Sequence, residues 1–199
     1  MTTPEMDRYC NVMEDVKGRI VAIDLIGTPA GQAVPVVVRI ESIYLQYRKI
    51  LELFAFASLL TVPEKYAQVY EAYSKQRDAA QLLQALELAN PDFYPKPKLA
   101  GVAGKAPADR TSGFLTTGDF VELHRRCSEI AYARDPLAGL MDFDWYIGHA
   151  EQWRDKIIGL LDVHVTRLAG APDWQLVSMQ GGGHKVVSAA FDPAQGAKN

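Results

Sequence analysis

The chain lacks the features that usually mark disulfide-stabilised and strongly basic proteins. It holds only two cysteines, Cys10 and Cys127. Two are too few for a disulfide framework, and their wide separation excludes a paired-cysteine metal site. We therefore expect free, buried thiols, with Cys127 in the core. A formal charge of −3 provides no general basic field for nucleic acid or an anionic membrane, so any such contact needs a local patch.

The chain also lacks a long apolar run. A membrane-spanning helix needs about 20 mainly apolar residues, whereas the uncharged run after QYRKILE, residues 46–52, extends only from Leu53 to Pro63. The first residues, MTTPEMDRYC, carry Glu5 and Asp7 where a secretion signal would have positive charge followed by an apolar run. We therefore expect a cytoplasmic protein that does not contact membranes.

Motifs for metal, nucleotide and serine chemistry are missing as well. None of His124, His149 and His164 has a glutamate three residues before it, as a di-iron bundle would require. The glycines at 181–183 lie between two predicted strands, without a following helix whose N-terminus could hold phosphate. No Gly-x-Ser-x-Gly elbow occurs. We expect no metal and no cofactor.

What is present is a helical pattern in a chain of ordinary composition. With 48% hydrophobic and 23% charged residues, the chain is typical of one globular domain, which we place at 1–199. We predict a mainly α fold, a five-helix up-and-down bundle with a C-terminal β-hairpin. Apolar residues recur at spacings of three and four in helices predicted at 5–26, 36–60, 62–89, 117–134 and 143–168.

The ends of these helices have recognisable signals. Thr61 with Pro63 and Glu64 resembles a capping box, Thr117 is a candidate cap for the fourth helix, and Asp142 or Asp144 begins the fifth. The segment 91–116 is rich in proline, glycine and alanine and predicts a long loop. The pieces WQLVSM and KVVSAAF, joined through QGGGH, predict a hairpin over 174–191.

Two histidines of the fifth predicted helix have different expected environments. His164 falls in the apolar stripe and is expected to be a hydrogen-bonded core residue. His149 lies on the outer face and is expected to be solvated.

Charged residues form a stripe on the helix predicted at 36–60. Glu41, Arg48 and Glu52 follow one another at spacings of seven and four, which aligns them on one side. Arg48 can therefore pair with Glu52 one turn later and approach Glu41 two turns earlier. We predict a structural ion-pair network inside the bundle, held by Arg48.

The segment RRCSEIAYARDP, residues 125–136, concentrates polar chemistry. Arg125, Ser128 and Tyr132 share one flank of the predicted helix, and Arg126 projects to the other. The simpler interpretation is an exposed helix face on which Glu122 and Glu129 balance the arginines.

The segments IESIYLQYRKILELFAFASL, NPDFYPKP and LTTGDFVELHRRCSEIAYARDP, about a quarter of the chain, resemble an uncharacterised bacterial family with HEPN-like helical bundles. HEPN ribonucleases pair an arginine with a histidine a few residues later, usually at a dimer interface. In the resembling family, histidine stands at the position of Tyr132 and asparagine at that of Asp135. Here none of the four histidines follows an arginine by five to seven residues. A tyrosine with a pKa of about 10 is a poor base at neutral pH.

Two functions remain. The favoured one is a non-catalytic HEPN-like module that binds a protein or RNA partner, in a phage-defence or mobile-element setting. The alternative is a metal-independent ribonuclease with a degenerate site, in which Arg125 or Arg126 is the cation and Tyr132 the base. Under either function, the residues expected to support binding are Glu41, Arg48, Glu52, Ser128, Arg134 and Asp135. A homodimer and a small-molecule pocket lined by tyrosines both stay open.

Overall fold

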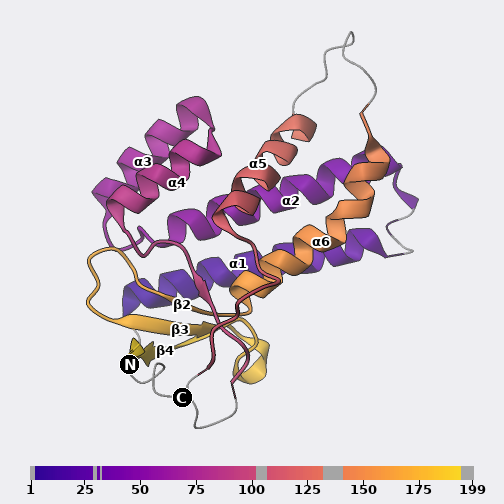
Figure 1. Cartoon of the computed structure of the whole chain (residues 1–199). Coiled ribbons are helices and arrows are strands. Elements are labelled where there is room, and N and C mark those ends of the chain that lie inside the picture. Colours follow the sequence, from indigo (N-terminus) through magenta and orange to yellow (C-terminus); the bar gives the residue numbers. More distant parts are fainter. Residues whose placement is uncertain (1–2, 29–30, 32, 102–106, 132–140, 194–199) are drawn as a thin grey trace.

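The computed structural model describes residues 3–28, 31, 33–101, 107–131 and 141–193. This part of the chain is mainly helical, with six α-helices and a small antiparallel sheet at one end (Figure 1). No helix within it is long and apolar enough to cross a membrane. Tyr132, Arg134 and Asp135 fall outside the described residues, as does the end of the helix predicted at 117–134.

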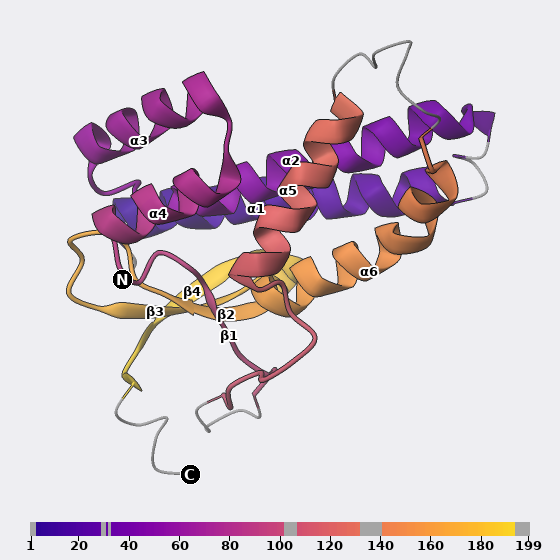
Figure 2. The ribbon, with the colours of Figure 1, turned by 45° about the horizontal axis from the view of Figure 1, so that its top comes forward.

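Two long helices, α1 (Pro4–Gly27) and α2 (Val36–Ala57), lie side by side in opposite directions (Figure 2). α1 starts at Pro4, and the preceding Thr3 caps it by accepting a hydrogen bond from the backbone N–H of Met6. Its buried residues recur at spacings that place them on one face, and they are Met6, Tyr9, Met13, Val16 and Ile23. α2 is buried on several sides because α1, α5 and α6 all contact it.

The single helix predicted at 62–89 is wrong, because the chain forms two helices, α3 (Pro63–Gln76) and α4 (Ala79–Ala89). Arg77 adopts the left-handed conformation, with φ 51° and ψ 33°, and ends α3. The side chain of Asp78 then accepts a hydrogen bond from the backbone N–H of Gln81 and caps α4. The predicted capping box at Thr61 is also wrong, since its hydroxyl donates to the carbonyl of Ala169 at 2.5 Å.

Helices α5 (Thr117–Ala131) and α6 (Phe143–Leu161) follow. Thr116, rather than the predicted Thr117, caps α5: its hydroxyl accepts from the N–H of Asp119, whose carboxylate accepts in return from the N–H of Thr116. Asp142 caps α6 by accepting a hydrogen bond from the N–H of Trp145. Asp142 was one of the two residues predicted to begin this helix.

The fifth helix does not extend to residue 168 as predicted, because the chain turns into a strand after Leu161. Four strands, β1 (Lys96–Pro97), β2 (Val163–Thr166), β3 (Trp174–Ser178) and β4 (Val187–Phe191), form an antiparallel sheet in that order. β3 and β4 are the predicted hairpin, with Trp174 opposite Phe191. The loop predicted at 91–116 is not wholly irregular, since it supplies β1 and a bridge between Lys98 and Asp109.

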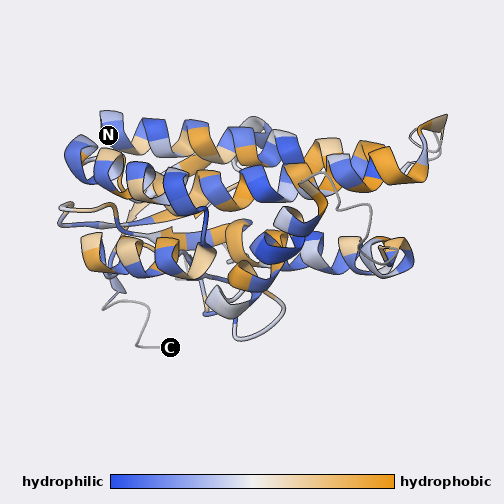
Figure 3. Ribbon diagram, turned by 90° about the horizontal axis from the view of Figure 1, so that it is seen from above, coloured by the Kyte–Doolittle hydropathy of each residue, from blue (hydrophilic) through white to orange (hydrophobic). Residues whose placement is uncertain are grey.

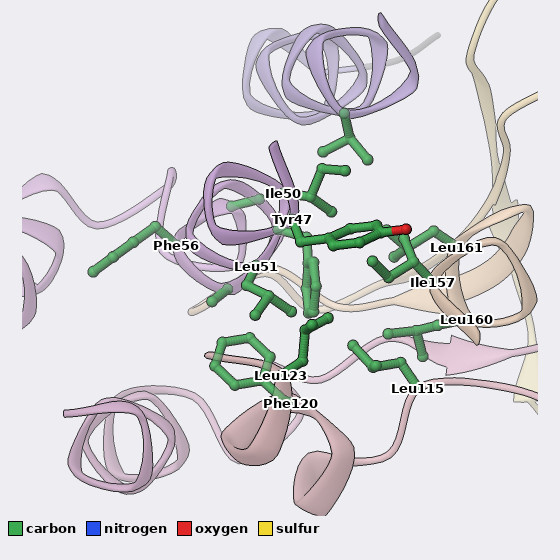
Figure 4. Close-up of a cluster of buried hydrophobic side chains, with 14 of the residues drawn as sticks. Tyr47, Ile50, Leu51, Phe56, Leu115, Phe120, Leu123, Ile157, Leu160 and Leu161 are labelled. Atoms are coloured by element: carbon green, nitrogen blue, oxygen red, sulfur yellow. The ribbon is translucent and has the colours of Figure 1, made fainter. Parts of the chain in front are cut away.

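The core lies between α2, α5 and α6. Figure 4 shows Leu51, Leu123 and Leu160, one from each of these helices, converging on the same region, and all three are completely buried. Both cysteines are free, as expected; Cys127 is buried, whereas Cys10 is only partly buried.

His164 is a core residue, as predicted, but it belongs to β2 rather than to a helix. Its Nδ1–H donates to the carbonyl of Leu161 at 2.8 Å, so Nε2 is free to accept from the hydroxyl of Tyr9, also at 2.8 Å. Burial lowers the pKa of His164 to about 4, which keeps the ring neutral. The Tyr9 contact joins α1 to the sheet.

Candidate functional site

A cluster of polar side chains lies among α2, α3 and α5. We call it the polar cluster. It consists of Arg48 and Glu52 from α2, Tyr73 from α3, and His124 and Ser128 from α5. Because three helices contribute, the cluster exists only in the folded chain.

Arg48 is the centre of the polar cluster and is only 6% exposed. Its Nε donates to Glu52 Oε1 at 3.0 Å, and one terminal nitrogen donates to Ser128 Oγ at 2.6 Å. The other terminal nitrogen donates to the hydroxyl of Tyr73 at 3.0 Å. Burial lowers the pKa of Arg48, but the hydrogen bond to Glu52 and the proximity of Tyr73 outweigh it and leave the pKa raised. The guanidinium therefore stays charged.

Tyr73 links Arg48 to the histidine. Its hydroxyl lies 2.8 Å from Glu52 Oε1 and 2.7 Å from His124 Nε2. A phenol has one proton, so it donates to Glu52 or to His124 but not to both. When it donates to Glu52, the Nε2–H of His124 can donate to the phenol oxygen. Burial, reinforced by Glu52, raises the pKa of Tyr73, which keeps the phenol neutral.

His124 was not among the predicted site residues. It is 3% exposed, and burial together with the nearby Arg48 charge lowers its pKa to about 4. The available signal was its spacing of four residues from Phe120 and Ser128, which places it at the edge of the buried stripe. Tyr73 had no such signal, because its orientation depends on the break between α3 and α4.

The predicted stripe on α2 is present only in part. Glu52 pairs with Arg48 as expected, whereas Glu41 is exposed and lies outside the polar cluster. Within the described residues, the side-chain nitrogens of Arg48 bond to Glu52, Ser128 and Tyr73 instead.

The two predicted catalytic arginines form a charge ladder on the surface of α5. Arg125 pairs with Glu122, with Nη2 2.7 Å from Oε1, and also with Glu129. Arg126 pairs with the same two carboxylates, with Nε 2.8 Å from Glu122 Oε1. Its guanidinium also lies over the ring of Trp145, 4.1 Å from the centroid. Glu122 and Glu129 thus neutralise the charges of the two arginines, as expected from the sequence.

The structure does not bring Arg125 and Ser128 into one site. The hydroxyl of Ser128 accepts from Arg48 and donates to the carbonyl of His124 at 3.0 Å, so it belongs to the polar cluster. Arg125 is 48% exposed and points to its glutamate partners. Their proposed partner Tyr132 lies outside the described residues, together with Arg134 and Asp135.

A second feature is an apolar cleft of about 570 Å³ between the end of α1, the start of α2, and α6. Its lining includes Ile40, Ile43 and the rings of Tyr44 and Tyr47. The two tyrosine hydroxyls donate to the carbonyls of residues 146 and 150, at 3.0 and 2.5 Å. Both tyrosines are almost completely buried, so they form the inner wall of the cleft and anchor α2 to α6.

Charged residues lie at the edge of this cleft. Arg154 pairs with Asp24, which ties α6 to α1. Arg39 and Glu151 also line the cleft, and neither makes a side-chain ion pair within the described ranges. The Nε of Arg39 is buried and has no hydrogen-bond partner there.

His149, on the same helix as Arg154, is partly buried rather than fully solvated. Its ring stacks on Trp145 with 4.1 Å between centroids, and its Nδ1–H donates to the carbonyl of Trp145 at 2.7 Å.

Among the described residues no group of three or more histidine, cysteine, aspartate and glutamate side chains is placed to hold a metal ion.

The resemblance to HEPN-like bundles stays a prediction based on three short segments of the sequence. Comparison with known proteins adds no relative, since no protein-family model, curated protein or solved structure matches the chain.

Proposed function

We propose that the protein is a non-catalytic, HEPN-like helical module that binds a protein partner through the apolar cleft between α1, α2 and α6. The observation that carries the proposal is the cleft itself, which opens beside a group of exposed apolar side chains. The setting predicted from the sequence, phage defence or a mobile element, remains part of the proposal.

The geometry of the polar side chains favours binding over RNA cleavage. Cleavage without a metal needs a base that titrates near neutral pH and a cation that can reach the developing charge. His124 is buried with a pKa lowered to about 4, and burial raises the pKa of Tyr73. Arg125 and Arg126 are each shared between two carboxylates. None of these groups is ready for either role.

A protein partner is favoured over RNA for a related reason. Nucleic-acid binding depends on several cations that are free to neutralise phosphates. Of the described arginines that line the cleft, Arg154 pairs with Asp24, and the unpaired Arg39 shares the lining with the unpaired Glu151. Most of the residues that line the cleft are apolar, and Figure 3 shows where hydrophobic residues fall along the helix ribbons. Exposed apolar patches are typical of protein-binding sites. The large apolar side chains exposed at the end of α1, at the start of α2, between these two helices and on α6 include Leu25, Val34, Val36, Val37, Val38 and Ile147.

We infer that the occupant is an amphipathic helix of the partner. Such helices place apolar side chains at every third or fourth position into a groove between helices. The cleft has this form, with α2 along one side and α6 along the other. Arg39 on α2 and Glu151 on α6 lack ion-pair partners within the described residues, so a helix with an acidic residue toward α2 and a basic residue toward α6 would complement both.

The test uses peptides selected by phage display against the native protein from a library of amphipathic helices. Val36 and Ile147 line the cleft and are 40% and 48% exposed, so Val36→Glu and Ile147→Glu should leave the fold intact. Each variant is expected to weaken the selected peptides at least about tenfold, because a charge would be buried on binding. Leu88→Glu on α4, where the leucine is 83% exposed and does not line the cleft, should bind like the original chain.

Selection of peptides that bind all three variants equally would refute the docking site. So would tighter binding of single-stranded RNA than of any peptide, if Val36→Glu and Ile147→Glu left RNA binding unchanged.

A further inference from the structure

A smaller cavity of about 240 Å³ adjoins the polar cluster, between α2 and the C-terminal half of α3. Arg48, Glu52 and Tyr73 of the cluster line it, and Lys49 and Arg77 complete its charged lining. It is separate from the apolar cleft, because the two share no lining residue.

The charges around this cavity do not balance. Among the described lining residues, Arg48, Lys49 and Arg77 are cationic and Glu52 is the one carboxylate, which leaves an excess of two positive charges. Lys49 and Arg77 make no ion pair within the described residues. The neighbouring carboxylate of Asp78 does not line the cavity and accepts the capping hydrogen bond of α4 at 2.8 Å. The arginines on the surface of α5 differ, since each is paired.

Arg77 lies at the C-terminal end of α3, in an unusual backbone conformation. Its φ of 51° lies in the left-handed region, which is unfavourable for residues other than glycine. Glycine is the usual residue where a helix ends in this conformation. An arginine at this position interacts favourably with the C-terminal end of the α3 dipole, and because it also lines the cavity, its guanidinium adds positive charge there.

The buried part of the cavity also offers donors. Arg48 carries five N–H donors, and three hydrogen bonds to Glu52, Ser128 and Tyr73 do not use all of them. Tyr70, which is 52% exposed, also lines the cavity. Charge and hydrogen-bond donors thus converge from the floor and from the rim.

We propose that this cavity binds the phosphate group of a phosphate monoester. The excess of two positive charges matches a dianion, and charge-assisted bonds from arginine to phosphate are among the strongest hydrogen bonds in proteins. Arg77 and Lys49 contact the phosphate oxygens from the rim, and Arg48 provides charge from the floor. The volume is below the range of about 300–1,000 Å³ typical of sites that enclose a whole small molecule, so the rest of the ligand extends into solvent.

Calorimetric titration of the full chain with phenyl phosphate, at low ionic strength and pH 7.5, tests the proposal. Arg77→Gly removes the guanidinium while suiting the left-handed backbone, so its melting temperature should be maintained or raised. We expect Arg77→Gly and Lys49→Gln each to weaken binding about tenfold or more. Lys75→Gln is the matched control, because Lys75 is exposed on α3, pairs with Glu71 and lies outside the cavity.

Two further probes define the ligand. Dimethyl phosphate, a monoanionic diester, should bind at least about tenfold more weakly than phenyl phosphate. A phosphoserine peptide that binds more tightly than phenyl phosphate, with the same dependence on Arg77, would identify a phosphorylated protein as the source of the monoester. Equal binding would indicate a small molecule. The proposal is overturned if phenyl phosphate does not bind at millimolar concentration, if Lys75→Gln weakens it as much as Arg77→Gly does, or if diester and monoester bind alike.

Discussion

Replacing Arg48 by methionine should destabilise the fold more than any other single change to the charged residues of α2. The guanidinium is 6% exposed and donates to Glu52, Ser128 and Tyr73. Methionine fills much of the same volume but donates nothing, so three acceptors lose a partner. Removing one member of a buried ion pair costs about 3 to 5 kcal/mol, because the other charge stays unpaired.

The structure places the expected value near the lower end of that range. The side chain of Glu52 is 25% exposed, so water can partly rehydrate its carboxylate after the arginine is gone. We therefore expect a loss of about 3 kcal/mol. For a chain of this length, that loss corresponds to a fall in melting temperature of roughly 6 to 12 °C.

Urea denaturation and thermal melting, both followed by circular dichroism, measure this effect. Glu52→Gln should cost less, about 1 to 2 kcal/mol, because its amide oxygen still accepts from Arg48. The double variant should be less destabilised than the sum of the two single variants, since both act on one network. Glu41→Gln is the control on the same helix and should change stability by less than about 0.5 kcal/mol, because Glu41 is exposed. Additive effects below about 1 kcal/mol for Arg48→Met and Glu52→Gln would show that the polar cluster is not a buried network.

Three further predictions concern two glycines of α6, the pH dependence of stability and RNA cleavage. A Cβ on Gly159 would lie 1.9 Å from a backbone carbonyl oxygen, whereas one on Gly148 meets nothing within 4 Å, so Gly159→Ala should cost about 1 to 3 kcal/mol and Gly148→Ala should stabilise the fold by about 0.5 to 1 kcal/mol. Equal melting temperatures for these two variants would contradict the close approach at Gly159. Because the folded-state pKa of His164 is lowered to about 4, the unfolded chain binds the extra proton as pH falls below about 6.5, and this residue should lower stability by about 1.4 kcal/mol per pH unit down to pH 4. His124, whose pKa is also lowered to about 4, should add a similar decline. His164→Gln should reduce that slope in urea titrations at several pH values, and an unchanged slope would mean that the histidine is not buried neutral. The purified protein in chelator should not cleave single-stranded RNA above background; cleavage that disappears in both Arg126→Ala and Tyr132→Phe proteins that remain folded would overturn the non-catalytic assignment.

Local features of the sequence were sufficient where neighbours along the chain decide the structure. The spacing of Tyr9 and Met13 predicts the buried face of α1 because a helix brings every third and fourth residue to one side. The alternation of WQLVSM and KVVSAAF around a glycine-rich turn predicts β3 and β4 in the same way. The pairing of Arg126 with Glu122 is likewise a contact between adjacent helical turns.

Tertiary packing decided what such spacing cannot. The residues from Val163 to Thr166 continue the apolar pattern of α6, yet they form β2 because Val177 and Pro97 of the two neighbouring strands pair with His164 there. Helical and strand periodicities are hard to separate over so short a stretch, and the hydrogen bonds of the sheet determine the outcome.

The polar cluster shows the same division most clearly. The sequence identified Arg48 and Glu52 as a pair because they are four residues apart on one helix. It gave no sign that Tyr73 and His124 would join them, because the left-handed turn at Arg77 and the packing of α5 on α2 bring those side chains together. Burial in that contact keeps the histidine neutral and the arginine partnered, since both depend on exclusion of water by three helices that are distant in sequence.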